Sequence, residues 1–313
     1  MCAMAKALHG NDSLLAVRQD LAVEVASRIR RLFSCIRFGE VLVLQGAPVM
    51  GCVLAMGKPT MAKCALGAVF VMANVCLVAH MWSLNDWADQ LTDAADDRKS
   101  RHVFTRKGIG PKALLGLSLG LLGAGLMLFA WLTAATFWIA VGLTLLSFIY
   151  SFPGVHAKSV ALLSSLPHLA GGFLHFLLGY SLFGSVDPDA LRIALVFALI
   201  LTAGHGVQEV QDHDADRRSG LRTNAVVFGK FSVFGTALLA FLFVYGYLWH
   251  LAAAGIVPFR LGPVSLALAG LQLYWAIQAL NTRLSFAGVR EYRHRYRGLF
   301  ALLGLTVIST LFL

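Results

Sequence analysis

Acidic and amide side chains gather directly after an apolar run that ends at Leu84. Asn85, Asp89 and Asp93 are spaced four residues apart, and Asp86 comes three residues before Asp89. On a helix such residues share one face, so their oxygens converge. Converging carboxylates repel one another unless water solvates them or a cation lies between them, and Mg²⁺ takes oxygen ligands together with substrate phosphates. The stretch predicts either a solvated loop or a metal site.

A second acidic stretch follows another long apolar run. Glu209, Asp212 and Asp216 again have helical spacing, and the same offset separates Asp89 from Asp212 and Asp93 from Asp216. Two acidic helix ends that leave a membrane on the same side can face each other across a cavity. The pairing therefore favours a two-cluster metal site over two separate solvated loops.

Basic side chains follow both acidic stretches. Arg98 and Arg101 follow the first, and Arg222 follows the second. The acidic side chains could bind a metal ion, and the basic side chains that follow could bind an anion. Together they suggest a phosphate-bearing ligand that is held through the metal.

A third element of interest is the loop that runs from Tyr150 to Lys158. Pro153 and Gly154 predict a turn there, so Tyr150 and Lys158 flank a loop that we expect at the depth of the acidic stretches. Lys158 is a candidate for direct contact with a phosphate. An interfacial lysine that marks the end of a membrane span is the alternative, and the sequence does not separate the two.

The composition is that of an integral membrane protein. Of the 313 residues 58% are hydrophobic and 13% are charged, with a mean hydropathy of +0.72, whereas soluble domains average about 25% charged residues. The long continuous apolar runs indicate helices rather than a β-barrel.

The net charge of +10 is not taken as a sign of nucleic-acid binding, because the basic residues lie in loops on one side. The five cysteines show no metal-binding or disulfide spacing, and no signal peptide is expected.

Nine apolar segments predict nine membrane-spanning helices. Residues 1–36 form an amphipathic, basic segment that we expect to lie on the membrane surface, and residues 37–313 form the membrane domain. The segments run over 38–57, 64–84, 113–133, 136–151, 159–184, 190–208, 231–251, 262–280 and 298–313.

The lysines and arginines predict the orientation of these spans. With the N-terminus inside and nine spans, all of the 26 basic residues except Lys58, Lys63, Arg192 and Arg260 fall on one face. Positive charge accumulates on the cytoplasmic side. We therefore expect a multi-pass protein, most simply of a bacterial inner membrane, with its N-terminus and both acidic motifs on the cytoplasmic face.

Three motifs together resemble those of the UbiA superfamily of intramembrane prenyltransferases. They are NDxxDxxxD at 85–93, YSxPxxxxK at 150–158 and ExxDxxxDxxxGxxT at 209–223. Their order, their places after the second, fourth and sixth spans, and the nine-span count agree with that family. The resemblance covers the chain from about residue 37 to its end.

The resemblance implies an all-α bundle of nine transmembrane helices around a central cavity, capped by cytoplasmic helical loops. It implies Mg²⁺ ions at the cytoplasmic mouth that bind the diphosphate of a polyprenyl donor. Asp86 and Glu209 occupy positions that are acidic in many members, and we take them as candidate catalytic bases. The metal ligands would be Asn85, Asp89, Asp93, Asp212 and Asp216, and the diphosphate contacts Arg101, Tyr150 and Lys158, with Arg98 and Arg222 as further candidates.

Four places depart from the family pattern. Glu209 stands where Asp is commoner, and Asn224 follows Thr223 where Leu is common. Gly154 replaces a usual second proline, and Val103-Phe104 replace the usual Arg-Pro. None of these departures removes a metal ligand, so they bear on the acceptor rather than on the donor chemistry. The NDW and YSxP sequences are closer to members that act on chlorin-like or homogentisate-like acceptors than to the 4-hydroxybenzoate type.

Histidines within apolar segments are the remaining candidates. His168 and His175 are seven residues apart and share a helix face, and His205 precedes Glu209 by one turn. They could line an acceptor pocket, or they could be neutral histidines that bond to neighbouring helices.

The predicted function is Mg²⁺-dependent transfer of a prenyl group to a lipophilic, aromatic acceptor, with release of pyrophosphate. A membrane terpene cyclase that acts on the donor alone is the first alternative. An ion-coupled transporter is a distant one, because the acids cluster at one face rather than near mid-membrane. For the prenyl-transfer function we expect three partners: the polyprenyl diphosphate donor, the lipophilic acceptor and membrane lipid.

Overall fold

A computed structural model describes residues 21, 23–90, 104, 108–152 and 157–309. Within these residues every long element is a helix, and the one isolated β-bridge joins Val160 to Arg222. The predicted all-α class is therefore confirmed for the described part of the chain.

The helices follow the predicted apolar segments, with four differences. The first segment divides into two helices, and the fifth becomes a helix of only 15 residues. The sixth continues past its predicted end at residue 208 to Arg218, and the last helix begins at Phe286, well before the predicted residue 298. The helices are α2 (Phe38–Val43), α3 (Gly46–Met56), α4 (Met61–Ala88), α6 (Pro111–Leu132), α7 (Ala134–Ser151), α8 (Leu166–Tyr180), α9 (Pro188–Arg218), α10 (Asn224–Phe228), α11 (Lys230–Ala253), α12 (Leu261–Asn281) and α13 (Phe286–Ser309), with short 3-10 turns at Ala157–Ser159 and Leu163–Ser165.

Seven helical segments of the described chain are long and apolar enough to cross a membrane. They are α4, α6, α7, α9, α11, α12 and the segment Phe38–Met56, which joins α2 and α3. Helix α8 is too short by this measure, and α13 carries arginines in its first half. The chain is thus a multi-pass integral membrane protein with about seven candidate spans, and nine spans stay a prediction.

Local sequence explains where several helices begin. The side chain of Thr60 accepts a hydrogen bond from Lys63 N, Thr133 does the same for Thr136 N, and Asp187 does so for Ala190 N. Such caps satisfy backbone N–H groups that lack a partner within the helix.

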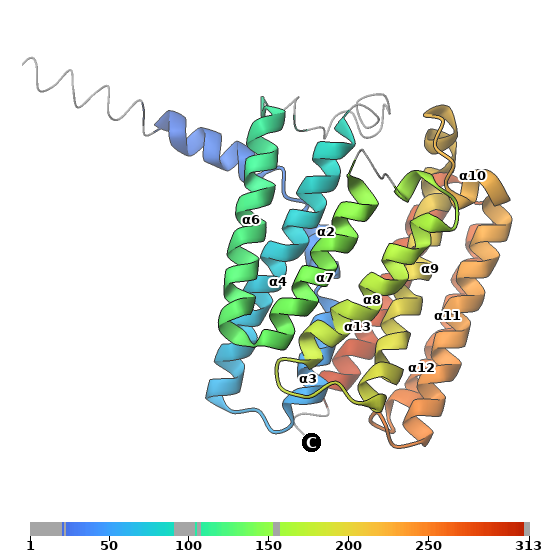
Figure 1. The fold of residues 1–313 in the computed structure, drawn as a ribbon. Helices are drawn as coiled ribbons and strands as arrows, with labels where there is room; N and C mark the ends of the chain where they lie inside the picture. The colour runs from blue at the N-terminus through green and yellow to red at the C-terminus, as the bar shows by residue number, and fades with distance from the viewer. Residues whose placement is uncertain (1–20, 22, 91–103, 105–107, 153–156, 310–313) are drawn as a thin grey trace, which may run out of the picture.

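Helices α4 and α9 carry the acidic motifs because both are longer than the membrane requires. They have 28 and 31 residues, or about 42 and 46 Å at 1.5 Å per residue, against about 30 Å of hydrocarbon. Their C-terminal ends lie at the same end of the bundle (Figure 1). The surplus turns therefore bring Asp89 and Asp212 to one end of the molecule.

Helix α8 joins the two halves of the apolar core. Its residue Phe176 belongs to a cluster with α9, α11, α12 and α13, whereas Leu178 belongs to a cluster with α4, α6 and α7. Glycines allow this close packing. A Cβ on Gly179 or Gly51 would overlap the backbone where α8 crosses α3, and a Cβ on Gly172 would overlap the backbone of α9.

The crossing of α3 and α8 should be sensitive to a single added methyl group. We expect Gly179→Ala to lower the free energy of unfolding by about 1–3 kcal/mol, because the backbone near Pro48 has to shift. Thermal unfolding in detergent measures the effect. Gly116→Ala in α6 is the matched control: nothing lies within 4 Å of its Cβ position, so the unfolding midpoint should stay level or rise. Equal midpoints for the two variants would contradict the tight crossing.

Candidate active site

One cavity of about 890 Å³ is lined by described residues of both acidic motifs. Asn85 and Asp89 reach it from the end of α4, and Asp212 and Asp216 reach it from α9. The structure thus brings together the two motifs that the sequence placed at matching helix ends.

The first motif converges on a lysine. The ammonium group of Lys158 donates a hydrogen bond to Asn85 Oδ1 at 3.2 Å and forms an ion pair with Asp89. The hydroxyl of Ser151 donates to the same oxygen of Asn85 at 3.2 Å. Side-chain oxygens of Asn85 and Asp89 therefore both contact the positive charge of Lys158.

Asp86 points elsewhere, although the sequence made it a catalytic candidate. Its carboxylate accepts a hydrogen bond from Arg37 Nε at 3.1 Å and pairs with the same guanidinium through its other oxygen. Asp86 is not among the residues that line the cavity, whereas Arg37 is. Its position gives it a role in holding α4 to the start of α2.

Glu209, the other catalytic candidate, is held from three sides. Its Oε1 accepts hydrogen bonds from Ser164 Oγ at 2.9 Å and Asn224 Nδ2 at 3.2 Å, and it lies 3.0 Å from His205 Nε2. The residue is 4% exposed and lines the cavity. Its second oxygen, Oε2, is buried without a hydrogen-bond partner among the described residues.

The predicted histidines all line the same cavity. The rings of His168 and His205 stack with their centroids 3.7 Å apart, and Tyr150 meets His168 edge-on at 4.9 Å. His168 Nδ1 lies 3.0 Å from the carbonyl oxygen of Ser164. The cavity position agrees with an acceptor pocket. The contact of His168 with Ser164 lies four residues back along the same segment and not on a neighbouring helix, so the role of these histidines stays a prediction.

The remaining predicted diphosphate and metal residues divide into two groups. Asp93, Arg98 and Arg101 lie outside the described residues. Arg222 is exposed, pairs with Val160 through its backbone, and is not among the cavity-lining residues.

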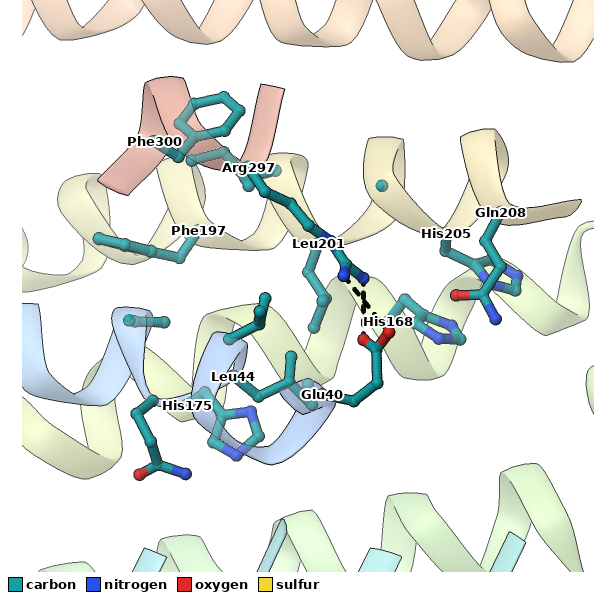
Figure 2. A pocket seen from close by; sticks show the side chains of 18 of the residues that line it. Glu40, Leu44, His168, His175, Phe197, Leu201, His205, Gln208, Arg297 and Phe300 are labelled. Carbon is teal, nitrogen blue, oxygen red and sulfur yellow. Dashed lines mark hydrogen bonds and ion pairs between the residues drawn. The ribbon is translucent and has the colours of Figure 1, made fainter. Parts of the chain in front are cut away.

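Sequence reasoning missed a set of polar residues on α13. Arg297 donates to both carboxylate oxygens of Glu40, at 3.3 and 2.9 Å, and Arg293 donates to Gln208 at 3.3 Å and Gln211 at 3.0 Å. Figure 2 shows Glu40 and Arg297 reaching toward each other across the pocket, between His168 and His175. The four-residue spacing of Arg293 and Arg297 was the available signal.

The oxygen donors fit a divalent cation that is shared with a substrate. Among the described residues no three acidic, histidine or cysteine side chains form a metal cluster. Mg²⁺ commonly uses one or two carboxylates and completes its shell with water and phosphate oxygens. Asp89 already holds a cationic group, and Asp212 and Asp216 line the same cavity. The donor set therefore fits Mg²⁺ that is held jointly with a phosphate ligand.

Comparison with known proteins gives the family. Residues 47–290 match the UbiA prenyltransferase family. This match covers most of the chain, and the chain belongs to that family.

Several curated proteins are similar to this chain. The chloroplastic chlorophyll synthase of Arabidopsis thaliana is 30% identical over 192 residues, which cover 57% of this chain and 49% of that protein. The chain thus spans about half the length of the chlorophyll synthases that it matches. The 4-hydroxybenzoate octaprenyltransferase of Psychrobacter arcticus is 26% identical over 79% of this chain and 80% of its own length.

Solved structures share the fold. A UbiA homolog from Archaeoglobus fulgidus bound to GPP and Mg²⁺ has a TM-score of 0.68, covering 89% of this chain and 99% of its own, at 16% identity. The same homolog bound to DMAPP and Mg²⁺ has a TM-score of 0.67.

The Glu40–Arg297 pair should contribute to stability more than a surface pair does. Their side chains are 32% and 24% exposed, so we expect a coupling free energy of about 1 kcal/mol in a double-mutant cycle with Glu40→Gln and Arg297→Gln. The control cycle uses Asp189 and Arg192, whose side chains are 53% and 54% exposed, and should give about 0–0.5 kcal/mol. Denaturant titration in mixed micelles measures both, and equal couplings would contradict the expectation.

Proposed function

We propose that the protein transfers a prenyl group from an isoprenoid diphosphate to a lipophilic acceptor, with Mg²⁺ as cofactor and pyrophosphate as the second product. The proposal rests on one observation: Asn85 and Asp89 line the same cavity as Asp212 and Asp216. The ammonium group of Lys158 contacts the side-chain oxygens of the first two residues. Membership of the UbiA prenyltransferase family supports it.

The cavity mouth would stabilise the leaving pyrophosphate. Bound Mg²⁺, held by Asn85, Asp89, Asp212 and Asp216, would neutralise charge on the diphosphate oxygens. Lys158 would turn from Asp89 to the diphosphate, and Tyr150, which lines the same cavity, would contact it as well. Charges that are positioned before the bond breaks stabilise the developing anion better than water does, because they need not reorganise.

The apolar part of the cavity would hold the prenyl chain. Leu303, Leu305 and Val307 of α13 line it, with Val257 and Leu261 from the α11–α12 region. Burial of the tail contributes about 0.8 kcal/mol per CH₂. The same side chains exclude water, which would otherwise capture the allylic cation.

Glu209 is our choice for the residue that takes up the proton released by the acceptor. It lies in the cavity wall, and its contact with His205 offers a path for the proton. Asp86 is disfavoured, because Arg37 occupies both of its oxygens.

For the membrane arrangement we propose nine spans, with the N-terminus and the cavity mouth on the cytoplasmic side of a bacterial inner membrane. Helices α8 and α13 supply the two spans beyond the seven candidates. The distribution of lysine and arginine supports the orientation.

Loss of either acidic motif should abolish the reaction. We expect Asp89→Ala and Asp212→Ala each to lower pyrophosphate release by about 100-fold or more, because each removes charge that holds the diphosphate through the metal. Release is measured from geranyl, farnesyl and geranylgeranyl diphosphates, with a pool of phenolic acceptors and with Mg²⁺ or EDTA. Mass spectrometry of the products separates transfer from cyclisation of the donor.

The control for these variants is Asp214→Asn on α9, the helix that carries Asp212. Asp214 has a 64% exposed side chain that contacts His213 and Lys230, so its substitution should leave release unchanged. Normal activity in Asp89→Ala or Asp212→Ala would overturn the proposal.

Lys158 should oppose metal binding before the donor arrives and favour donor binding afterwards. We expect Lys158→Gln to tighten Mn²⁺ binding in the absence of donor by about tenfold and to raise the KM for the donor by a similar factor, since one charge-assisted contact is removed in each case. Free Mn²⁺ is measured by its EPR signal. Lys112→Gln, at the exposed start of α6, is the control, and unchanged or weaker Mn²⁺ binding in Lys158→Gln would contradict the competition.

A further inference from the structure

The helix before α2 carries an apolar face that the described chain leaves exposed. Residue 21 and residues 23–33 are helical. This dark blue helix leaves the bundle beside the start of α6 and runs across the direction of α6 (Figure 1). Four large apolar side chains are spaced four residues apart on one face and are 59, 45, 50 and 46% exposed: Leu21, Val25, Ile29 and Phe33. A patch of this kind marks a site of interaction with a protein or a membrane.

Arginines border this apolar face on both sides. At 3.6 residues per turn, Arg28 lies about 80° from the centre of the face in one direction, and Arg30 lies about 120° from it in the other. Arg31 lies farther round, on the polar side of the helix. Glu24 is the one acidic residue of 23–33 and pairs with Arg28. Three arginines against one glutamate leave residues 23–33 with a net charge of +2, so the borders of the apolar face are complementary to negative charge.

The inner end of the helix is fixed to the bundle. Leu32, which lies on the same side as the exposed apolar residues, packs against the cluster that contains Leu114 of α6. Ile36 is buried, and the guanidinium of Arg37 pairs with Asp86 at the end of α4. The side of the helix that contacts the protein at its inner end therefore continues outward past α6 (Figure 1), where its side chains are about half exposed.

The boundary between lipid and water lies at this end of the bundle. Helix α4 is longer than the hydrocarbon is thick, so its C-terminal end, which Arg37 contacts, reaches the headgroup region. An amphipathic helix at this depth lies with its apolar face in the boundary of the acyl chains and its basic side chains among the headgroups. A helix of this length is marginal in water by itself, so contact with lipid would also stabilise it.

We propose that residues 21–33 form a surface helix that binds the anionic lipids of the bilayer. Leu21, Val25 and Ile29 enter the edge of the hydrocarbon. Arg28 and Arg30 contact lipid phosphates on the two sides of the helix. None of residues 23–33 lines the catalytic cavity, so this binding surface is separate from the site of prenyl transfer and does not depend on that reaction.

Hydrogen exchange of the backbone amides of residues 23–33 tests the proposal. The full-length protein is placed in nanodiscs that hold one copy each, made either of phosphatidylcholine alone or of phosphatidylcholine mixed with phosphatidylglycerol. We expect exchange to be slower by about tenfold or more in the mixed discs, because each arginine near an anionic surface contributes about fivefold to binding. No donor, acceptor or metal is added.

Two valines of the same helix give a matched pair of variants. Val25 lies on the apolar face and is 45% exposed, whereas Val23 lies on the polar side and is 70% exposed. We expect Val25→Gln to speed exchange by about tenfold in both kinds of disc, because it removes apolar surface from the lipid. Val23→Gln makes the same chemical change and should leave exchange as it is in the wild-type protein.

A second pair of variants tests the charge. Arg30→Gln should reduce the effect of phosphatidylglycerol by about fivefold, because it removes one of the two bordering arginines. Its control is Arg290→Gln, which removes an exposed arginine from α13 and should leave the exchange of residues 23–33 unchanged.

Three results would overturn the surface helix. The first is equal exchange in the two kinds of disc, and the second is the same response to Val23→Gln and Val25→Gln. The third is protection that appears only when two copies share a disc, since a second copy of the chain would then cover the apolar face. Because pyrophosphate release is not measured, each of these results leaves the test of prenyl transfer unaffected.

Discussion

Mutual repulsion of acidic groups at one cavity mouth is the constraint on which the rest of the structure depends. Asn85 and Asp89 from α4 face the same space as Asp212 and Asp216 from α9, in surroundings where carboxylates are poorly solvated. Lys158 lies against the first pair. The ammonium group of Lys158 thus supplies positive charge at this mouth, and in the proposed reaction a diphosphate with its metal would take over that contact.

The close packing of α8 against α3 and α9 determines which of its side chains line the cavity. Gly51 and Gly179 bring α3 and α8 together, and Gly172 brings α8 against α9. This close approach leaves His168 and His175 directed into the cavity. The glycines of α8 therefore differ in their surroundings. Gly172 and Gly179 lie against the backbone of other helices, so an added side chain there would lower stability strongly, whereas Gly171 has space at its Cβ position.

Glu209 and Asn224, two residues that depart from the family pattern, contact each other. Asn224 donates from Nδ2 to Glu209 Oε1 at 3.2 Å and accepts at Oδ1 from Leu162 N at 2.6 Å. Ser164 donates to the same carboxylate oxygen. The longer side chain of Glu209 and the amide that replaces an apolar residue therefore form one hydrogen-bonded unit. It ties the start of α10 to α9 and to the segment before α8, beside the His168–His205 stack.

The sequence by itself determined the helices, their approximate limits and the faces of α4 and α9 that carry acids, because helical periodicity and apolar length are local properties. It also carried the family motifs. Tertiary structure alone decided which polar residues meet. It turned Asp86 toward Arg37, stacked His168 on His205, and brought Arg297 to Glu40. These contacts depend on how each helix is rotated and how closely it packs, which spacing along one helix does not encode. The early start of α13 was missed because its arginines, of which Arg293 and Arg297 line the cavity, resemble those of a loop.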